Sequence, residues 1–436
     1  MMNMKKWVLA LTSSVVLLSQ SAFALDIQTW KTSNGVEVLF VESHDLPMID
    51  VRLAFKAGSS RDGDLYGISR LVNALIVEGT GDYSSEDVAE NFESVGAELG
   101  HDSLRDMAFV SLRSLSDKQA WEKVVDLFAR VSALPSFPLD AIERDRKSML
   151  ISLANREKEI GDVAEDTFYK NLYKNHVYKV GRAGTKQTMQ AITQKNLSDF
   201  HSKYYVANNA TLALMGDLTL DQAKQYAEQI TQYLKAGQKA SPIEAVKMAE
   251  QGGTIKVPFK TSQTHIIQGL PVMKRGDDDY YALYLGNHIL GGSGFSSRLM
   301  QEIRENRGLS YSVYSYFLPM ESNGPFQMAL QTKNHQVDEA SQLLNQMLVD
   351  FIKDGPTDAE IDHSKKNITG SFPLKIDSNN KIVEYLSLIG FYDLPLDYLD
   401  SFNANILKVT SEDIKDAFSR RVKPEQLIRV IVGEAS

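Results

Sequence analysis

Short sequence patterns recur along this chain at an almost constant separation. Thr193 and Thr410 each open a similar pentapeptide and lie 217 residues apart, and Gly216 and Gly433, which end two predicted strands, are also 217 residues apart. An Asp-Ala pair at position 140 recurs at position 358, a separation of 218 residues. Near-constant offsets indicate an internal duplication, and this unit is far too long to be a solenoid repeat. The sequence therefore predicts two homologous domains.

Each half mixes strand-like and helix-like patterns. In the first half, residues 35–41 and 48–57 alternate in polarity as strands do, whereas residues 68–77 place their apolar side chains on one helical face. This mixture predicts an α+β fold in which each domain is a sheet packed by helices. We expect the domains at 25–234 and 254–436, joined by a linker at 235–253 that is rich in Gly, Ala, Lys, Ser and Glu.

Residues 1–24 have the pattern of a signal peptide. Lys5 and Lys6 precede a short apolar run, and the segment ends in Ala22-Phe23-Ala24, which matches a signal-peptidase site. The apolar run is too short and too poorly flanked for a typical membrane span. We therefore expect export, to a bacterial periplasm, without stable insertion in the membrane.

Residues 290–317 read as a glycine loop, a helix, a tight turn and a strand. Ser293 or Ser296 can cap the first turn of the helix, and Leu299 and Ile303 give it one apolar stripe. Gly308 stands where a helix usually ends.

A strand is predicted to follow, from Tyr311 to Phe317, because its residues alternate as the two faces of a strand do. The turn between helix and strand can bring the guanidinium of Arg304 and the phenol of Tyr311 to the same edge. Such a pair can bind a peptide carbonyl or carboxylate by charge-assisted hydrogen bonds. On the residues alone, a solvated helix charge and an ordinary sheet tyrosine remain the alternative interpretation.

The same stretch resembles a known peptidase signature. The stretch is similar to the C-terminal half of pitrilysin/insulinase-type zinc peptidases, the family that includes mitochondrial processing peptidase. The similarity lies in a glycine-rich segment followed by S-S-R-L and then by R-E-x-x-G-L-x-Y. The resemblance implies that Arg304 and Tyr311 bind substrate opposite the zinc. It also implies that the two halves face each other like a clamshell around a peptide chamber.

The first half resembles this family too, but without its active centre. Residues 67–80 are similar to the helix G-L-x-H-x-x-E-H-x-x-x-x-G-T, in which two His bind zinc and the Glu is the general base. The corresponding residues here are Arg70, Asn73 and Ala74, none of which can perform those roles. The family's third ligand, a Glu further along the chain, is missing from the segment Lys147–Asn155. We therefore predict no catalytic residue and no metal ligand in this chain.

The sequence gives little support for a metal site elsewhere, for disulfides or for nucleic-acid binding. No two of the eight histidines form a local pair, although a site assembled from distant histidines remains open. The absence of cysteine excludes thiolate metal sites and disulfides. A net charge of −9 without a basic stripe argues against nucleic-acid binding. We interpret Glu157, Glu159 and Asp162 as a solvated helix face.

These observations predict an exported, non-catalytic subunit of a zinc metallopeptidase. It would bind peptide substrates for a paralogous partner subunit, which carries an intact H-x-x-E-H motif and the zinc. Two alternatives remain open. One is a non-enzymatic peptide-binding or scaffold protein of the same fold, and the other is a peptidase that is active alone through an unrecognised site.

Overall fold

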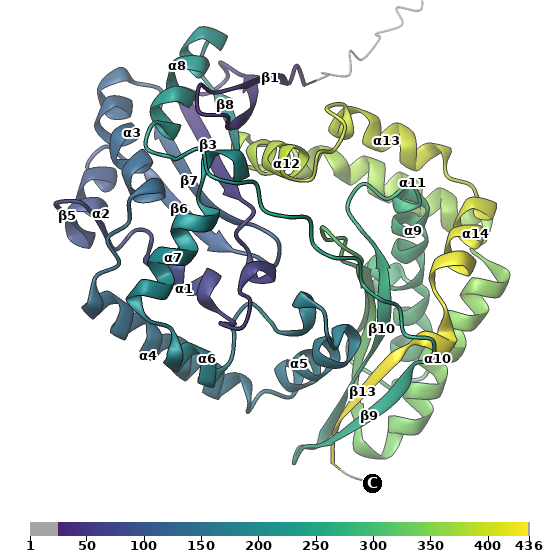
Figure 1. Ribbon diagram of the computed structural model, residues 1–436. Helices are drawn as coiled ribbons and strands as arrows, with labels where there is room; N and C mark the ends of the chain where they lie inside the picture. Colours follow the sequence, from purple (N-terminus) through teal and green to yellow (C-terminus); the bar gives the residue numbers. More distant parts are fainter. Residues whose placement is uncertain (1–24, 435–436) are drawn as a thin grey trace, which may run out of the picture.

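The computed structural model describes residues 25–434, which form two lobes, each a β-sheet covered by helices (Figure 1). The first sheet has six strands and the second has five. The first is built from β1 (Gln28–Lys31), β2 (Glu37–Glu42), β3 (Met48–Phe55), β6 (Glu98–Ser103), β7 (Ala108–Leu115) and β8 (Ala210–Gly216). The second is built from β9 (Gly253–Pro258), β10 (Gln263–Met273), β11 (Val313–Phe317), β12 (Gly324–Lys333) and β13 (Ile428–Gly433).

The two sheets share one topology. The strand order is β1-β2-β8-β3-β7-β6 in the first sheet and, read from its other edge, β9-β13-β10-β12-β11 in the second. In both sheets the last strand of the half pairs in parallel with an early strand, β8 with β2 and β13 with β9, whereas the remaining pairs are antiparallel. The α+β class and the duplication predicted from the sequence are therefore confirmed.

In both halves a run of five helices precedes the last strand. The first half holds α1 (Ile68–Leu75), α2 (Ser85–Glu93), α3 (Lys118–Ala133), α4 (Leu139–Arg156), α5 (Ile160–Tyr173), α6 (Lys186–Ala191), α7 (Gln194–Tyr204) and α8 (Leu220–Thr231). The second half holds α9 (Tyr280–Asn287), α10 (Val337–Asp354), α11 (Asp358–Ser371), α12 (Asn379–Phe391), α13 (Tyr398–Lys408) and α14 (Ser411–Arg421).

The repeated threonines have a local structural role. Thr193 begins α7 and Thr410 begins α14, and each forms a capping box in which its side chain accepts a hydrogen bond from the backbone N–H three residues later. This satisfies an amide that the first helical turn leaves free. The constant spacing seen in the sequence thus marks two equivalent helix starts.

Two helices are exchanged between the lobes. α5 lies in the first half of the sequence but packs against β10 and β13 of the second sheet, and α12 lies in the second half but packs against β3 and β8 of the first. The two helices begin at residues 160 and 379, so they occupy equivalent places in the duplicated plan. Each half therefore supplies one helix that covers the other half's sheet.

This exchange explains why the central strands are buried on both faces. Along β2 and β8, Phe40 and Leu214 point into the core of the first half, whereas the alternate residues Leu39 and Ala213 join the core of the second half. Successive residues of a strand face opposite sides of the sheet, so each strand serves two cores. In the second sheet, Ile267 and its neighbours pack with α5 in the same way.

The segment that joins the halves is extended and fixed by contacts. Residues 235–252 contain no regular helix or strand, yet Val246 is buried and several backbone groups are bonded. The carbonyl of Ser241 accepts from Arg61 at 2.7 Å, and the carbonyl of Glu244 lies 2.9 Å from a ring nitrogen of His176. On the second half, the N–H groups of Ile243 and Val246 donate to the side chains of Glu321 and Ser322, both at 3.2 Å, so the segment packs along both halves.

Three local predictions were wrong. The sequence of residues 139–160 predicts one long, highly charged helix, but the helix ends at Arg156 and a separate helix, α5, begins at Ile160. Neither Ser293 nor Ser296 caps the next helix; the hydroxyl of Ser297 accepts from the N–H of Met300 at 3.4 Å, and the segment Met300–Asn306 is π-helical. The strand expected from Tyr311 begins two residues later, at Val313.

Candidate functional site

The degenerate zinc positions lie on α1, which is held in place by a buried carboxylate. The N–H groups of Gly67 and Ser69 donate to Asp62 at 2.6 and 3.0 Å. Gly67 adopts a positive φ of 93°, which favours glycine at this start of the helix. Burial raises the pKa of Asp62 to about 7, against the lowering effect of these hydrogen bonds.

The three residues that replace the motif do not fit a zinc ion. Asn73 is buried, donates to the carbonyl of Phe109 at 3.1 Å, and its side-chain oxygen lies 3.2 Å from Nδ1 of His101. Arg70 is a cation and Ala74 has no ligand atom. Within residues 25–434, no group of three His, Cys, Asp or Glu side chains could hold a metal ion. Of the three residues that replace the zinc motif, Asn73 therefore serves as a structural contact and Arg70 contributes a positive charge.

A cavity of about 1300 Å³ opens beside α1. Its walls come from α1, α4, α5 and the segment 179–185, and Leu318 of the second half completes it. Four residues of the segment in which the third zinc ligand was sought line this cavity, and none is acidic: Ser148, Ile151, Ser152 and Asn155. The structure therefore brings together the separate stretches that the zinc motif would occupy, with other chemistry in them.

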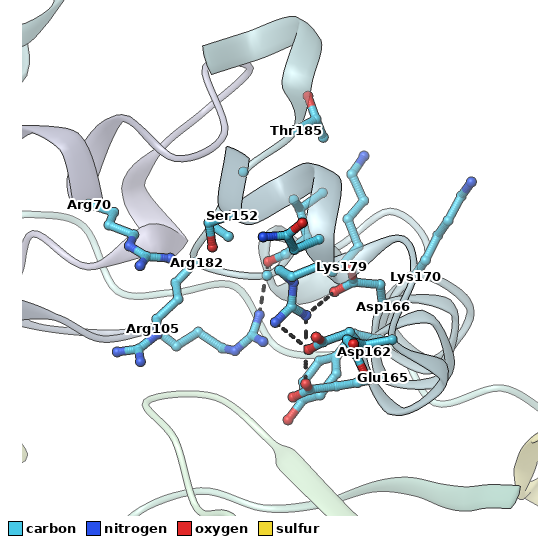
Figure 2. A pocket seen from close by; sticks show the side chains of 18 of the residues that line it. Arg70, Arg105, Ser152, Asp162, Glu165, Asp166, Lys170, Lys179, Arg182 and Thr185 are labelled. Carbon is cyan, nitrogen blue, oxygen red and sulfur yellow. Dashed lines mark hydrogen bonds and ion pairs between the residues drawn. The ribbon is translucent and has the colours of Figure 1, made fainter. Parts of the chain in front are cut away.

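The two sides of the cavity carry opposite charges. Figure 2 shows Arg70, Arg105 and Arg182 on one side, and Asp162, Glu165 and Asp166 of α5 on the other. The acidic group is gathered around Arg156, whose guanidinium nitrogens lie 2.5 Å from Asp162, 3.8 Å from Glu165 and 3.0 Å from Asp166. Three of the four acidic side chains that line the cavity are thus paired with Arg156, which also lines it.

This arrangement corrects the interpretation of the acidic residues. Asp162 was expected on a solvated helix face, but it is half-buried, lines the cavity and binds Arg156. Glu157 and Glu159 are exposed, as expected; Glu157 pairs with Lys186, and Glu159 lines the cavity. The sequence could not show this because the cavity wall forms only when α5 leaves the first half and packs on the second sheet.

Arg304 and Tyr311 lie together, as the sequence suggested. The guanidinium carbon of Arg304 is 4.9 Å from the centre of the Tyr311 ring and 4.7 Å from the centre of the Phe295 ring. Tyr311 is 84% exposed and Phe295 is 70% exposed, which is unusual for rings of this size. Phe295 was missed by the sequence analysis, although it stands directly after the glycine loop.

Strand β11 connects this cluster to the cavity. Tyr311 stands two residues before β11 and Leu318, which lines the cavity, directly follows it. Between them, the rings of Tyr314 and Tyr316 stack at 6.1 Å, and burial followed by the charge of Glu165 on α5 raises the pKa of Tyr314. The exposed cluster and the cavity are thus two ends of one edge strand, about 23 Å apart at 3.3 Å per residue.

Comparison with known proteins agrees with these features. The family model described as "Insulinase (Peptidase family M16)" matches residues 37–186, and the one described as "Peptidase M16 inactive domain" matches residues 191–368. Together they account for more than half of the chain. The chain belongs to the peptidase M16 family. This confirms the resemblance to insulinase-type peptidases.

Individual relatives of this M16 chain carry contrasting names. The crystal structure of a peptidase M16 inactive domain from Pseudomonas fluorescens is 38% identical, with a TM-score of 0.92, covering 94% of this chain and 99% of that one. "Non-peptidase homolog YmxG" of Helicobacter pylori is 27% identical over 99% of both chains. "Uncharacterized zinc protease YmxG" of Bacillus subtilis is 24% identical over 81% of this chain and 85% of its own.

Proposed function

We propose that this M16 chain is an exported, non-catalytic subunit that binds peptide for a zinc-bearing partner subunit of the same family. The observation that carries the proposal is the contrast between its two halves. The α1 helix offers an Arg, an Asn bonded to its own protein and an Ala where two zinc ligands and the general base would stand. The Arg304–Tyr311 pair, in contrast, is intact, and Tyr311 is exposed.

The cluster of Phe295, Arg304 and Tyr311 suits a peptide ligand. A guanidinium and a phenol both donate hydrogen bonds, so they can hold a backbone carbonyl or a carboxylate. Aromatic and arginine side chains also contribute most strongly to binding at protein interfaces. Hydrolysis itself would require a metal-activated water, which we assign to the partner.

The relatives support a non-catalytic role without deciding the partner. The Helicobacter pylori homologue that spans the whole chain is named as a non-peptidase, and this agrees with the lost ligands of α1. The leader-like sequence 1–24, which lies outside the described residues, favours export to the periplasm. Within residues 25–434, no helix is long and apolar enough to cross a membrane.

The first test is recovery of the partner. A tagged mature protein is isolated from the native periplasm, and the proteins that accompany it are identified by mass spectrometry. We expect an equimolar relative with an intact H-x-x-E-H motif. Recovery of this chain with itself alone would refute the shared active site and favour the scaffold or peptide-binding alternative.

The second test addresses the paired subunits. Arg304→Ala and Tyr311→Phe should each lower peptide hydrolysis by the complex without dissociating it. Tyr311 is exposed, and the half-buried Arg304 lies against the exposed rings of Tyr311 and Phe295 rather than in a core, so both should contribute little to folding. We expect a loss of about tenfold or more, typical of a charge-assisted contact to substrate. Unchanged turnover in both variants would contradict a role for this pair.

A further inference from the structure

The basic side of the cavity has few counter-charges of its own. Arg105 donates to the carbonyls of Tyr178 and Val180 at 2.8 and 3.0 Å and lies 4.3 Å from the ring centre of Tyr169. These partners are neutral, so within the described part of the chain no carboxylate pairs with this guanidinium. Arg182 has one acidic partner, Asp102, at 2.9 Å.

Arg70 is the least satisfied of the three arginines. It is half-buried and lines the cavity, and among residues 25–434 it forms neither a hydrogen bond nor an ion pair. Burial, followed by the charge of Arg182, lowers its pKa. Like charges that approach in a partly desolvated site repel each other more strongly than they would in water. A ligand with negative charge would relieve this repulsion.

The acidic side chains that line the cavity do not neutralise this excess of positive charge. Seven cationic and four anionic side chains line the cavity, and three of those anions, Asp162, Glu165 and Asp166, already bind Arg156. The excess is positive in a chain whose net charge is −9. The positive charge is therefore local, and it lies where the family's zinc motif would be.

We propose that Arg70, Arg105 and Arg182 bind a carboxylate of a peptide, in place of the metal that the motif has lost. Guanidinium groups match the planar shape of a carboxylate and can bind it through two parallel hydrogen bonds. This inference rests on the proposed peptide-binding function and names the chemistry that the ligand must carry.

The size and lining of the cavity favour a peptide over a small free anion. A volume of about 1300 Å³ exceeds what one small ion needs and lies above the usual range of small-molecule pockets. Ser152, Asn155 and Thr185 line it and can hydrogen-bond a peptide backbone. The edge strand β11 leads from the Arg304–Tyr311 pair to the cavity, so one extended peptide could reach both.

The test measures peptide binding to the isolated mature chain by fluorescence anisotropy. The probes are a short labelled peptide of Ala, Ser and Gly with a central run of glutamates, and a matched peptide with glutamines instead. Both have amidated C-termini, and a third peptide has glutamines with a free C-terminal carboxylate. We expect the glutamate peptide, the free-carboxylate peptide or both to bind at least about tenfold more tightly than the amidated glutamine peptide. The pattern identifies which carboxylate is recognised.

Variants then assign the site. Arg70→Gln should abolish the preference while leaving the thermal unfolding curve unchanged, since Arg70 has no partner within the described protein to lose. Lys224→Gln, on the exposed face of α8, removes the same charge far from the lining residues and should keep the preference. Added inorganic phosphate should compete only weakly with the preferred peptide.

Three results would overturn the proposal. They are equal binding of all three peptides, a preference that survives in Arg70→Gln, and displacement by phosphate as effective as displacement by unlabelled peptide. None of them would affect the partner recovery or the Arg304 and Tyr311 measurements. Failure of this site is therefore distinguishable from failure of the proposed function.

Discussion

A buried hydrogen-bond network should couple the two halves of this protein. Asp106, in the first half, accepts from the hydroxyl of Tyr178 at 2.8 Å, from the backbone N–H of Glu321 at 2.7 Å and from the hydroxyl of Tyr392 at 3.0 Å. The Tyr178 hydroxyl also accepts from the N–H of Ser322 at 3.1 Å. The network thus joins residues from both halves.

The perturbation is Tyr178→Phe, which removes one hydroxyl and keeps the ring. Tyr178 is fully buried, so its loss leaves the Ser322 N–H and one oxygen of Asp106 without a partner and without water. A buried group left unsatisfied costs about 1–3 kcal/mol, so we expect a loss of about 3–5 kcal/mol in the free energy of unfolding. Asp106 is only 3% exposed, and this burial raises the pKa of its carboxyl.

The matched control is Tyr173→Phe. The Tyr173 hydroxyl donates only to the carbonyl of Asn323, at 3.1 Å, so its removal should cost about 1 kcal/mol. Urea unfolding is followed by two probes. Tryptophan fluorescence reports the first half, because Trp30 and Trp121 both lie there, and circular dichroism reports the whole chain. A loss in Tyr178→Phe no larger than in Tyr173→Phe would refute the reasoning.

Two further predictions concern other parts of the molecule. Because the pKa of Asp62 is about 7 in the folded protein against 3.8 ordinarily, its contribution to stability is fully present below pH 4 and is lost as the pH rises through 7. At 1.36 kcal/mol per unit the loss is about 4 kcal/mol, and urea unfolding of Asp62→Asn should lack this dependence; an equally steep fall with pH in the variant would contradict the assignment. Phe295→Ala should weaken peptide hydrolysis by the subunit pair severalfold, because an exposed ring beside Arg304 serves ligand contact, and should leave thermal unfolding unchanged; a large drop in unfolding temperature would instead indicate a structural role.

Features that depend on neighbouring residues could be predicted from the sequence. The duplication was visible because Thr193 and Thr410 are local caps, and capping needs only the next turn of helix. The proximity of Arg304 and Tyr311 followed from the short turn at Gly308, which has a φ of 61° and ends the helix by donating its N–H to the carbonyl of Arg304. The loss of the motif's two histidine ligands and its general base followed directly from the identity of Arg70, Ala74 and Asn73.

Features that depend on distant pairing could not be predicted. Phe168 on α5 packs with Ile267 and Val430, which come from the other half of the sequence, and nothing in the amphipathic pattern of α5 names that partner. The basic side of the cavity combines a helix residue, Arg70, with Arg105 and Arg182 from two separate loops. Only the tertiary fold gives these charges a common location.

The exchange of α5 and α12 has a consequence for proteolysis. The segment 235–252 is the only covalent connection between the halves, yet each half holds a helix that the other needs to cover its sheet. A protease that cuts this segment should therefore yield two fragments that stay bound and migrate as one species until a denaturant separates them. For the same reason, a gene divided at this segment should yield soluble protein only when both fragments are produced in the same cell.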